Sequence, residues 1–341
     1  MKRILSCIII LSILLSGCAA GNKPELKRYS ATFLNLFDTV TTIVGHAPTE
    51  AEFEEMTRKI HDELEYYHHL FDIYNDYTGI TNLKAVNDRA GVEPVVVDRA
   101  VIDLLLDCKT YYELTGGAVN VAMGSVLHLW HVARNDGIRD PANAYLPDAD
   151  ALAQAAEHMD ISKVEIDEAA STVFISDPNV RLDVGAVAKG WATQRVAENA
   201  PEGLLISVGG NVCATGVKKT DASPWVIGIQ DPDDAAGNLH TIYVSDCSVV
   251  TSGDYQRSYW VGSEQYHHII DPKTQMPARY WRSVSIVCDD SALADALSTA
   301  LFLLPLEQGR DLAAKCGVEA FWVGLTGEEH MTSGFENILR T

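Results

Sequence analysis

The sequence has few basic residues and few cysteines. Among 341 residues it carries 26 lysines and arginines against 47 aspartates and glutamates, which gives a formal net charge of −21. Because nucleic-acid binding needs a basic surface, so acidic a chain is not expected to bind nucleic acid. Its seven cysteines are too few for a disulfide framework, and no pair of them has the spacing of a zinc site. The five that follow Cys18 are expected to be mostly reduced and buried, with no chemistry of their own.

Repeats and nucleotide-binding fingerprints are missing as well. No segment recurs with a period of about 20 to 50 residues, which excludes a solenoid or a propeller. The chain has no GxGxxG motif and no regular alternation of strand and helix, so a Rossmann domain is not expected. No proline- or glycine-rich linker divides the chain after its N-terminal segment, which leaves one large domain as the simplest organisation.

The first 18 residues have the order of an export signal. Lys2 and Arg3 precede an apolar run over 4–15, which is too short to span a bilayer as a permanent helix. The run ends in Leu15-Ser-Gly-Cys18, which resembles a bacterial lipobox, where the cysteine thiol receives a diacylglyceryl group and becomes the first residue of the mature chain. The alternative is an ordinary signal peptide in which Cys18 is incidental.

The chain is accordingly divided into a lipoprotein signal peptide over 1–17, a lipidated Cys18 with a polar tether to residue 28, and one domain over 29–341. Lipidation, with palmitate among the expected acyl chains, predicts an exported protein. It would be anchored to the bacterial membrane and would face the extracytoplasmic side.

Hydrophobic periodicity predicts an α+β fold. Thr49 and Glu52 form a capping box, and apolar residues then recur every three or four positions, which predicts an amphipathic helix over 50–68. Alternating apolar residues around a turn-prone centre predict a hairpin over 164–175. Hairpin-connected strands with helices packed outside them are typical of an α+β domain with a mostly antiparallel sheet. Further helices are expected from 98, after Pro147-Asp148, over 187–199 and over 292–304, and further strands over 204–208, 225–229, 242–244, 258–261, 266–270 and near 320–324.

The segment Asp183-Val-Gly-Ala-Val-Ala-Lys189-Gly190 turns from a strand into a helix through small residues. Small residues let a ligand approach the backbone, a helix N-terminus favours anions, and Lys189 adds a positive charge. The segment is therefore a candidate phosphate cradle. The alternative is an ordinary tight corner between a strand and a helix, which is the better explanation if the segment is considered alone.

A second polar group lies in the apolar helix expected over 292–304. Asp295 and Thr299 are four residues apart and so share one helix face, where a carboxylate and a hydroxyl offer the oxygen ligands that Mg²⁺ or Ca²⁺ prefers. A carboxylate in so apolar a helix is unfavourable unless it is paired or bound to a metal, which favours a site. The alternative is that Asp295 caps a neighbouring loop and Thr299 bonds back to its own helix.

Histidine occurs in a third polar cluster. Thr251-Ser-Gly-Asp-Tyr255 precedes a predicted hairpin, which is followed by His267-His-Ile-Ile-Asp-Pro272. His268 could act as a general base or hold a phosphate near neutral pH, whereas His267 is expected to point to the other side of the strand. No Ser/His/Asp triad can be inferred from the spacing of these residues.

These segments together resemble the ApbE family of FAD:protein FMN transferases, in order along nearly the whole chain. One such segment would be unspecific, but seven in the family's order are a strong sign. The lipobox fits as well, since many family members are exported lipoproteins. The matching segments are Phe37-Asp-Thr39, Gly117-Ala-Val-Asn120 with Leu129-Trp130, Leu182–Gly190, Ser207-Val-Gly-Gly-Asn211, Thr251-Ser-Gly-Asp-Tyr255, His268-Ile-Ile-Asp-Pro272 and Ala294-Asp-Ala-Leu-Ser-Thr-Ala300.

The resemblance implies a T-fold-like α+β domain that binds FAD as its substrate, with Mg²⁺, or alternatively Ca²⁺, on the pyrophosphate. Asp295 and Thr299 would bind the metal together with the backbone carbonyl of Ala186. His268 would act in catalysis, as a base or by orienting the acceptor, and Lys189 would stabilise negative charge. The FAD site would be lined by Phe37, Tyr74, Ala118, Val119, Asn120, Asp183, Lys189 and Ile270.

The implied reaction transfers FMN from FAD to a threonine or serine hydroxyl of a partner flavoprotein and releases AMP. Flavin-carrying subunits of Rnf- and Nqr-type electron-transfer complexes are the expected acceptors. Two other functions stay open, namely an FAD pyrophosphatase that uses water and yields FMN and AMP, and a lipid-anchored flavin-binding protein without turnover. Asp295, Thr299, Lys189 and His268 argue against the passive binder, because storage alone needs neither a metal nor a base.

Overall fold

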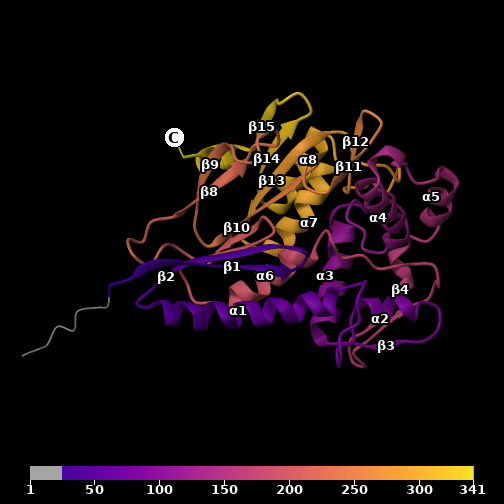
Figure 1. Cartoon of the computed structure of the whole chain (residues 1–341), viewed down its shortest axis with the longest axis horizontal. Helices are drawn as coiled ribbons and strands as arrows, with labels where there is room; N and C mark the ends of the chain where they lie inside the picture. The colour runs from indigo at the N-terminus through magenta and orange to yellow at the C-terminus, as the bar shows by residue number, and fades with distance from the viewer. Residues whose placement is uncertain (1–24, 341) are drawn as a thin grey trace, which may run out of the picture.

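The computed structural model describes residues 25–340, so the predicted signal peptide and Cys18 lie outside the described residues. Within that range the largest sheet has eight strands, and every neighbouring pair is antiparallel (Figure 1). Strand β1 begins two residues before the predicted domain start at 29. In spatial order the strands are β1 (Lys27–Leu36), β2 (Thr39–Ala47), β6 (Leu204–Val208), β7 (Asn211–Ala214), β10 (Cys247–Gly253), β13 (Trp281–Cys288), β14 (Glu319–Gly324) and β15 (Glu329–Met331).

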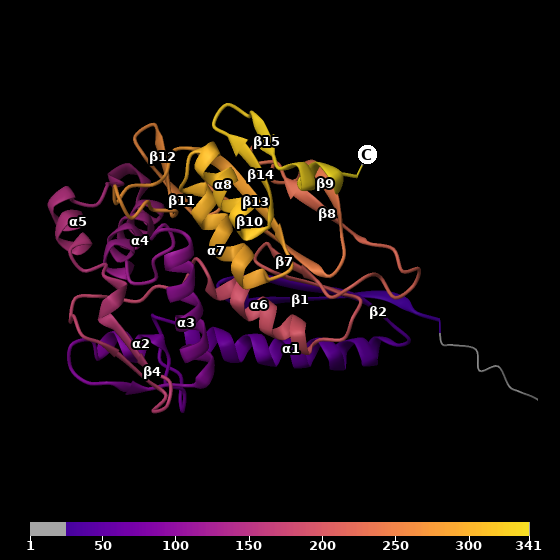
Figure 2. The same ribbon diagram turned by 180° about the vertical axis from the view of Figure 1, so that it is seen from behind.

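Five helices of the described range pack on one side of this sheet, and Figure 2 shows them in the view from behind. They are α1 (Glu50–Phe71), α3 (Arg99–Leu114), α6 (Ala188–Asn199), α7 (Ser291–Phe302) and α8 (Leu306–Cys316). The largest apolar core lies between these helices and the strands, and it contains the fully buried side chains of Trp191, Phe302 and Trp322. Burial of apolar area at this interface is the main force that holds the helices on the sheet.

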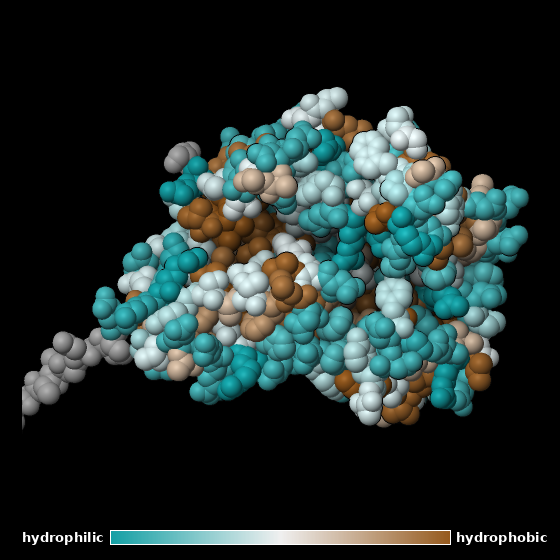
Figure 3. Space-filling view, viewed as in Figure 1, coloured by the Kyte–Doolittle hydropathy of each residue, from teal (hydrophilic) through white to brown (hydrophobic). Residues whose placement is uncertain are grey.

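The opposite side of the sheet is partly covered by the hairpin of β8 (Trp225–Gln230) and β9 (Asn238–Val244). Residues alternate between the two sides of a strand. In β14, Trp322 therefore joins the core under the helices, whereas Phe321 and Val323 join the core under this hairpin. Figure 3 shows that the outer surface is mainly hydrophilic on one face, with an apolar hollow beside the β8–β9 hairpin.

The remaining elements form smaller units around this centre. Helix α4 (Gly124–Arg139) packs with α5 (Ala149–Ala156) and with the hairpin of β11 (Ser258–Val261) and β12 (Glu264–His267). The predicted hairpin over 164–175 is confirmed as β4 (Val164–Asp167) and β5 (Thr172–Ile175). The other short elements are α2 (Leu83–Asp88), β3 (Val95–Val96), α9 (Ser333–Asn337) and two 3₁₀ turns over Pro141–Asn143 and Ile161–Lys163.

The helix predicted over 50–68 is confirmed as α1, and its predicted cap is present, since the Thr49 hydroxyl accepts a hydrogen bond of 3.3 Å from the Glu52 N–H. For the strand predicted over 266–270, the predicted end is wrong. Strand β12 stops at His267, because Ile269 and Ile270 pair instead with the segment around Pro277.

The five cysteines in the described range are free thiols, which confirms that they do not pair with one another. Cys108 and Cys213 are buried, and the others are partly buried. No helix between residues 25 and 340 is long and apolar enough to cross a membrane.

Helices α6 and α7 approach each other most closely at Gly190. A Cβ added there would overlap the carbonyl oxygen of Ser291 and the Cβ of Asp295. We expect Gly190→Ala to lower the free energy of unfolding by about 1–3 kcal/mol, because rigid backbone and a buried side chain would have to move. Urea unfolding of the purified domain would measure the change.

Gly309→Ala provides the matched control, since Gly309 also lies inside a helix. A Cβ at this position would lie 3.4 Å from Trp322, which is ordinary contact. Alanine is the better helix former by about 1 kcal/mol, so this variant should be as stable as the wild type or more stable. Equal effects of the two substitutions would contradict the close approach at Gly190.

Candidate active site

The structure contains a cavity of about 1190 Å³. It is lined by the turn between β1 and β2, the start of α6, the loop that follows β12, and one side of α7. Ligand pockets for small molecules measure about 300–1,000 Å³, so this one can accept a ligand as large as a dinucleotide. Each residue that the sequence predicted for the site lines it. These residues are Phe37, Tyr74, Ala118, Val119, Asn120, Asp183, Ala186, Lys189, His268, Ile270, Asp295 and Thr299.

Aromatic residues form one part of the cavity wall. Phe37 lies in the turn between β1 and β2, and Tyr74 follows the end of α1. The Tyr74 backbone N–H donates to Asp72 Oδ1 at 2.6 Å, and its ring stacks on His131 with centroids 5.2 Å apart. Tyr74 is therefore held in place by Asp72 just after α1 and by His131 on α4.

The loop after α3 completes this part of the wall. The Asn120 side chain donates to the Met159 carbonyl at 2.8 Å and accepts from the Ala122 N–H at 2.9 Å. Its amide thus fixes the path of the loop over 118–122, and with it the positions of Ala118 and Val119 at the cavity.

Asp295 joins α7 to the start of α6. The residue before α6, Val187, offers no side-chain cap, and Asp295 Oδ2 instead accepts the Gly190 N–H at 2.8 Å. Lys189 Nζ lies 3.7 Å from the same oxygen. Burial raises the pKa of Asp295, and the Lys189 ammonium opposes that rise. Asp295 therefore caps a neighbouring helix, which is close to the structural alternative that the sequence left open.

Asp295, Thr299 and Ala186 bring to the cavity three oxygens of the kind that a hard cation binds. Because the Gly190 N–H is directed to Asp295, no backbone hydrogen bond to the Ala186 carbonyl is found among residues 25–340. The Thr299 hydroxyl likewise makes no hydrogen bond in this range, whereas neighbouring Ser298 bonds back to the Asp295 carbonyl at 2.9 Å. A carboxylate, a hydroxyl and a carbonyl are ligands that Mg²⁺ and Ca²⁺ accept.

This set differs from a cluster of several carboxylates or histidines. No group of three or more His, Cys, Asp or Glu that could hold a metal is found between residues 25 and 340. The fit to a cation therefore depends on the free carbonyl of Ala186 and the free hydroxyl of Thr299. The remaining ligands of such a cation would come from a bound phosphate or from water.

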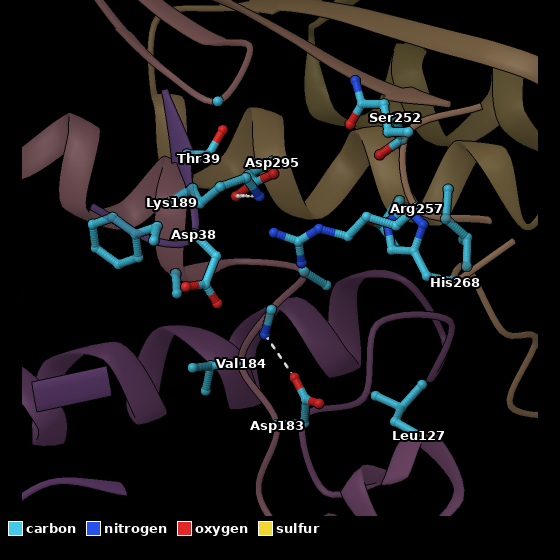
Figure 4. Close-up of a pocket in the computed structure, with 18 of the residues that line it drawn as sticks. Asp38, Thr39, Leu127, Asp183, Val184, Lys189, Ser252, Arg257, His268 and Asp295 are labelled. Atoms are coloured by element: carbon cyan, nitrogen blue, oxygen red, sulfur yellow. Dashed lines mark hydrogen bonds and ion pairs between the residues drawn. The ribbon is translucent and has the colours of Figure 1, made fainter. Parts of the chain in front are cut away.

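Two arginines that the sequence analysis did not identify also line the cavity. Arg134 lies on α4, and Arg257 lies in the loop between β10 and β11. Neither forms an ion pair with a carboxylate within residues 25–340. Figure 4 shows Arg257 extending into the cavity between Asp295 and Asp183. Burial lowers the pKa of Arg134, and the charge of Arg257 lowers it further, so the two cations repel each other without a ligand.

These cations stand out because the whole chain is so acidic. Together with Lys189 they make the cavity attractive to an anion with more than one charge. Asp183, one of the acidic side chains that also line the cavity, accepts the Gly185 N–H at 2.9 Å, and burial raises its pKa. An isolated arginine carries no local motif, so only the adjacency of Arg257 to the Thr251–Tyr255 segment hinted at its place.

His268 is neutral in this environment. Burial, followed by the nearby charge of Arg257, lowers the pKa of His268 to about 3. Its buried Nδ1 has no hydrogen-bond partner in the described part of the chain. His267 borders the cavity as well, but both of its ring nitrogens are bonded to the backbone, since Nε2 donates to the Ala278 carbonyl at 2.8 Å and Nδ1 accepts from the Ile269 N–H at 3.2 Å. His268 is thus the histidine of this pair whose ring can accept a proton in the cavity.

A sequence model of the ApbE family matches residues 37–322. The chain belongs to the ApbE family. It is 32% identical over 335 residues to the FAD:protein FMN transferase of Treponema pallidum (strain Nichols), covering 92% of this chain and 90% of that protein. Among solved structures, the ApbE protein of Thermotoga maritima superposes with a TM-score of 0.80 and 28% identity, over 92% of this chain and 100% of that chain.

The flavin transferase ApbE from Vibrio cholerae shares the fold, with a TM-score of 0.76, 23% identity, and coverage of 92% of this chain and 100% of that chain. These matches confirm the predicted family and the predicted α+β fold with a mostly antiparallel sheet. The names of the relatives agree with the predicted enzyme class, a flavin transferase.

The low pKa of His268 gives a test of the cavity's electrostatics. Its imidazole should stay neutral between about pH 8 and pH 5, because protonation would add a buried charge among cations. Bound ADP should raise this pKa, since its phosphates neutralise those cations. Histidine ¹H–¹⁵N spectra over a pH series would measure both effects, with His268→Gln to assign the signals. A titration midpoint near 6.5 in the ligand-free protein would contradict the described environment.

Proposed function

We propose that this protein is an FAD:protein FMN transferase, which moves FMN from FAD to a threonine or serine hydroxyl of a partner flavoprotein and releases AMP. The observation that carries the proposal is the composition of one cavity. It joins an aromatic wall to three cations, Lys189 and two arginines that have no carboxylate partner in the described range, and beside these cations lie three oxygens suited to a divalent metal. Membership of the ApbE family and the names of its relatives support the same reaction.

The aromatic residues and the charges of the cavity support one orientation of FAD. Phe37 and Tyr74 offer flat apolar surface to the isoalloxazine ring, which stacks well on aromatic side chains. Lys189, Arg134 and Arg257 offer positive charge to the pyrophosphate. In this orientation the flavin half lies toward α1 and the phosphates lie toward the start of α6.

Asp295, Thr299 and the Ala186 carbonyl would hold Mg²⁺, with Ca²⁺ as the other hard cation that such ligands accept. When bound, the metal supplies positive charge that stabilises the phosphate oxygens during transfer. Burial raises the pKa of Asp295 and Lys189 opposes that rise, and a bound cation would favour the ionised carboxylate further. One side chain would thus serve both as the cap on α6 and as a metal ligand.

The chain's own residues account for the other requirements of the reaction. The acceptor hydroxyl oxygen forms a bond to the flavin-side phosphorus, and the bond from that phosphorus to the AMP phosphate oxygen breaks. His268, neutral and with a free ring nitrogen, takes the hydroxyl proton. Lys189 and Arg257 stabilise the negative charge that remains on the phosphate oxygens and on AMP.

The carboxylate of Asp295 can be tested separately from its cap. Asp295→Asn keeps an acceptor for the Gly190 N–H but removes the charge, so we expect it to fold normally and to lose transfer by about 100-fold or more. Asp295→Ala should in addition lose about 0.5–2 kcal/mol of stability, because the cap on α6 is gone. Asp290→Asn is the control, since Asp290 caps α7 from outside the cavity.

The assay mixes the domain from residue 25 with FAD, Mg²⁺ and an acceptor fragment that carries a flavinylation-type Asp-x-x-(Ser/Thr)-x-Ala-Thr segment. Covalent flavin fluorescence in a denaturing gel and AMP release are followed together, with EDTA as the metal-free control. A fluorescent acceptor band with AMP supports the transferase. AMP and free FMN without the band would support a pyrophosphatase, intact bound FAD a carrier, and full activity of Asp295→Asn would exclude the metal site.

We also propose that the protein is exported and lipid-anchored, and that its acceptors are flavin-carrying subunits of membrane complexes such as the Rnf and Nqr types. The lipobox Leu15-Ser-Gly-Cys18 supports the anchor. An anchor would keep the cavity close to acceptors that are themselves in the membrane, which raises their effective concentration.

Labelling with radioactive palmitate tests the anchor. Cys18→Ser should abolish incorporation of label, because the thiol that receives the lipid is gone. Cys316→Ser is the control, since this thiol is partly buried on α8 and far from the lipobox in sequence. Label on the Cys18→Ser protein, or none on the wild type, would refute the anchor.

A further inference from the structure

The turn between β1 and β2 holds Phe37 in an unusual backbone conformation. Leu36 pairs with Thr39, so Phe37 and Asp38 form a two-residue turn, and their φ angles are +51° and +53°. Two-residue hairpin turns of this kind favour asparagine and glycine. A bulky aromatic residue in the left-handed region is strained, and such an outlier persists only where its surroundings hold it.

His68, near the end of α1, supplies that support. In a two-residue hairpin the N–H of the first turn residue does not join the strand ladder, so it needs another acceptor. The Phe37 N–H donates to His68 Nδ1 at 3.3 Å. The two rings also meet edge to face, with centroids 5.4 Å apart and planes at 73°.

The contact requires one protonation state of His68. Nδ1 must carry a lone pair to accept from Phe37, so the ring proton belongs on Nε2. Burial lowers the pKa of His68, which keeps the imidazole neutral and the acceptor available. Asp72, His69, Asp38 and Glu65 are the other titratable groups that act on this ring.

We infer that His68 is a positioning residue for the flavin, because it fixes Phe37 and thereby lets the end of α1 set both aromatic walls of the cavity. Tyr74 is set directly, through the hydrogen bond of its backbone to Asp72 just after α1. Phe37 is set indirectly, through His68. This inference rests on the proposed function, which places the flavin half of FAD against these two rings.

Separate binding of the two halves of FAD tests the inference. The full-length domain is titrated with riboflavin, followed by its fluorescence, and with AMP, followed by calorimetry. His68→Phe keeps a ring but loses the acceptor, and we expect its Kd for riboflavin to rise by about tenfold while its Kd for AMP stays unchanged. His68→Asn offers Oδ1 near the position of Nδ1 and should restore riboflavin binding to within about threefold of the wild type.

His69→Phe is the matched control, because His69 is the neighbouring histidine, stacks on Tyr77 at 3.9 Å and does not line the cavity. Unchanged riboflavin affinity in His68→Phe, an equal loss of AMP affinity, or an equal effect of His69→Phe would each overturn the inference. A wild-type protein that binds AMP but not riboflavin would instead overturn the proposed placement of the flavin, and the inference with it.

Discussion

The hydrogen bond from the Gly190 N–H to Asp295 is the contact on which the site depends. It lies at the seam between α6 and α7, where only a glycine allows the two helices to approach so closely. By taking this N–H, Asp295 caps α6, draws Lys189 toward itself and leaves the Ala186 carbonyl without a backbone partner. A packing contact between helices therefore also creates the oxygen set that suits a cation.

The positive charges of the cavity also link ligand binding to catalysis. Lys189, Arg134 and Arg257 converge in a protein whose net charge is −21, and the surrounding structure does not neutralise the two arginines. Their mutual repulsion is a cost that an anionic ligand removes on binding. Burial and, after it, the same cations lower the pKa of His268 in the free protein, so ligand binding and the basicity of this histidine are coupled.

Residues that stand in local motifs could be predicted from the sequence, and residues that meet only through packing could not. Lys189 and Asp295 were found because glycine-rich and helix-face patterns surround them. Arg134 and Arg257 sit in no such pattern, and their proximity is set by how α4 packs on the β11–β12 hairpin. The central strand β10 is not among the predicted strands, because both of its faces are covered and the adjacent Val249 and Val250 are both buried, so hydrophobic and polar residues do not alternate. Strand β13 does alternate over Ser283-Val-Ser-Ile286, and this signal could have predicted it.

The role of Asp295 shows that two interpretations of one residue need not compete. The sequence offered a metal ligand or a capping carboxylate as alternatives, and the structure shows the cap with an oxygen set beside it. The His68 contact is a case that sequence could not reach at all, since it joins a helix end to a turn 31 residues earlier through one backbone N–H.

The order in which the cavity is assembled has a consequence for folding. Its lining residues run from Phe37 to Leu303 in the sequence, so segments from most of the chain must be in place before the cavity exists. Because these residues are far apart in the sequence, we expect the cavity to form late in folding. A chain that is still incomplete or unfolded therefore has no place for a flavin, and ligand binding would report, and reinforce, the folding of the whole domain.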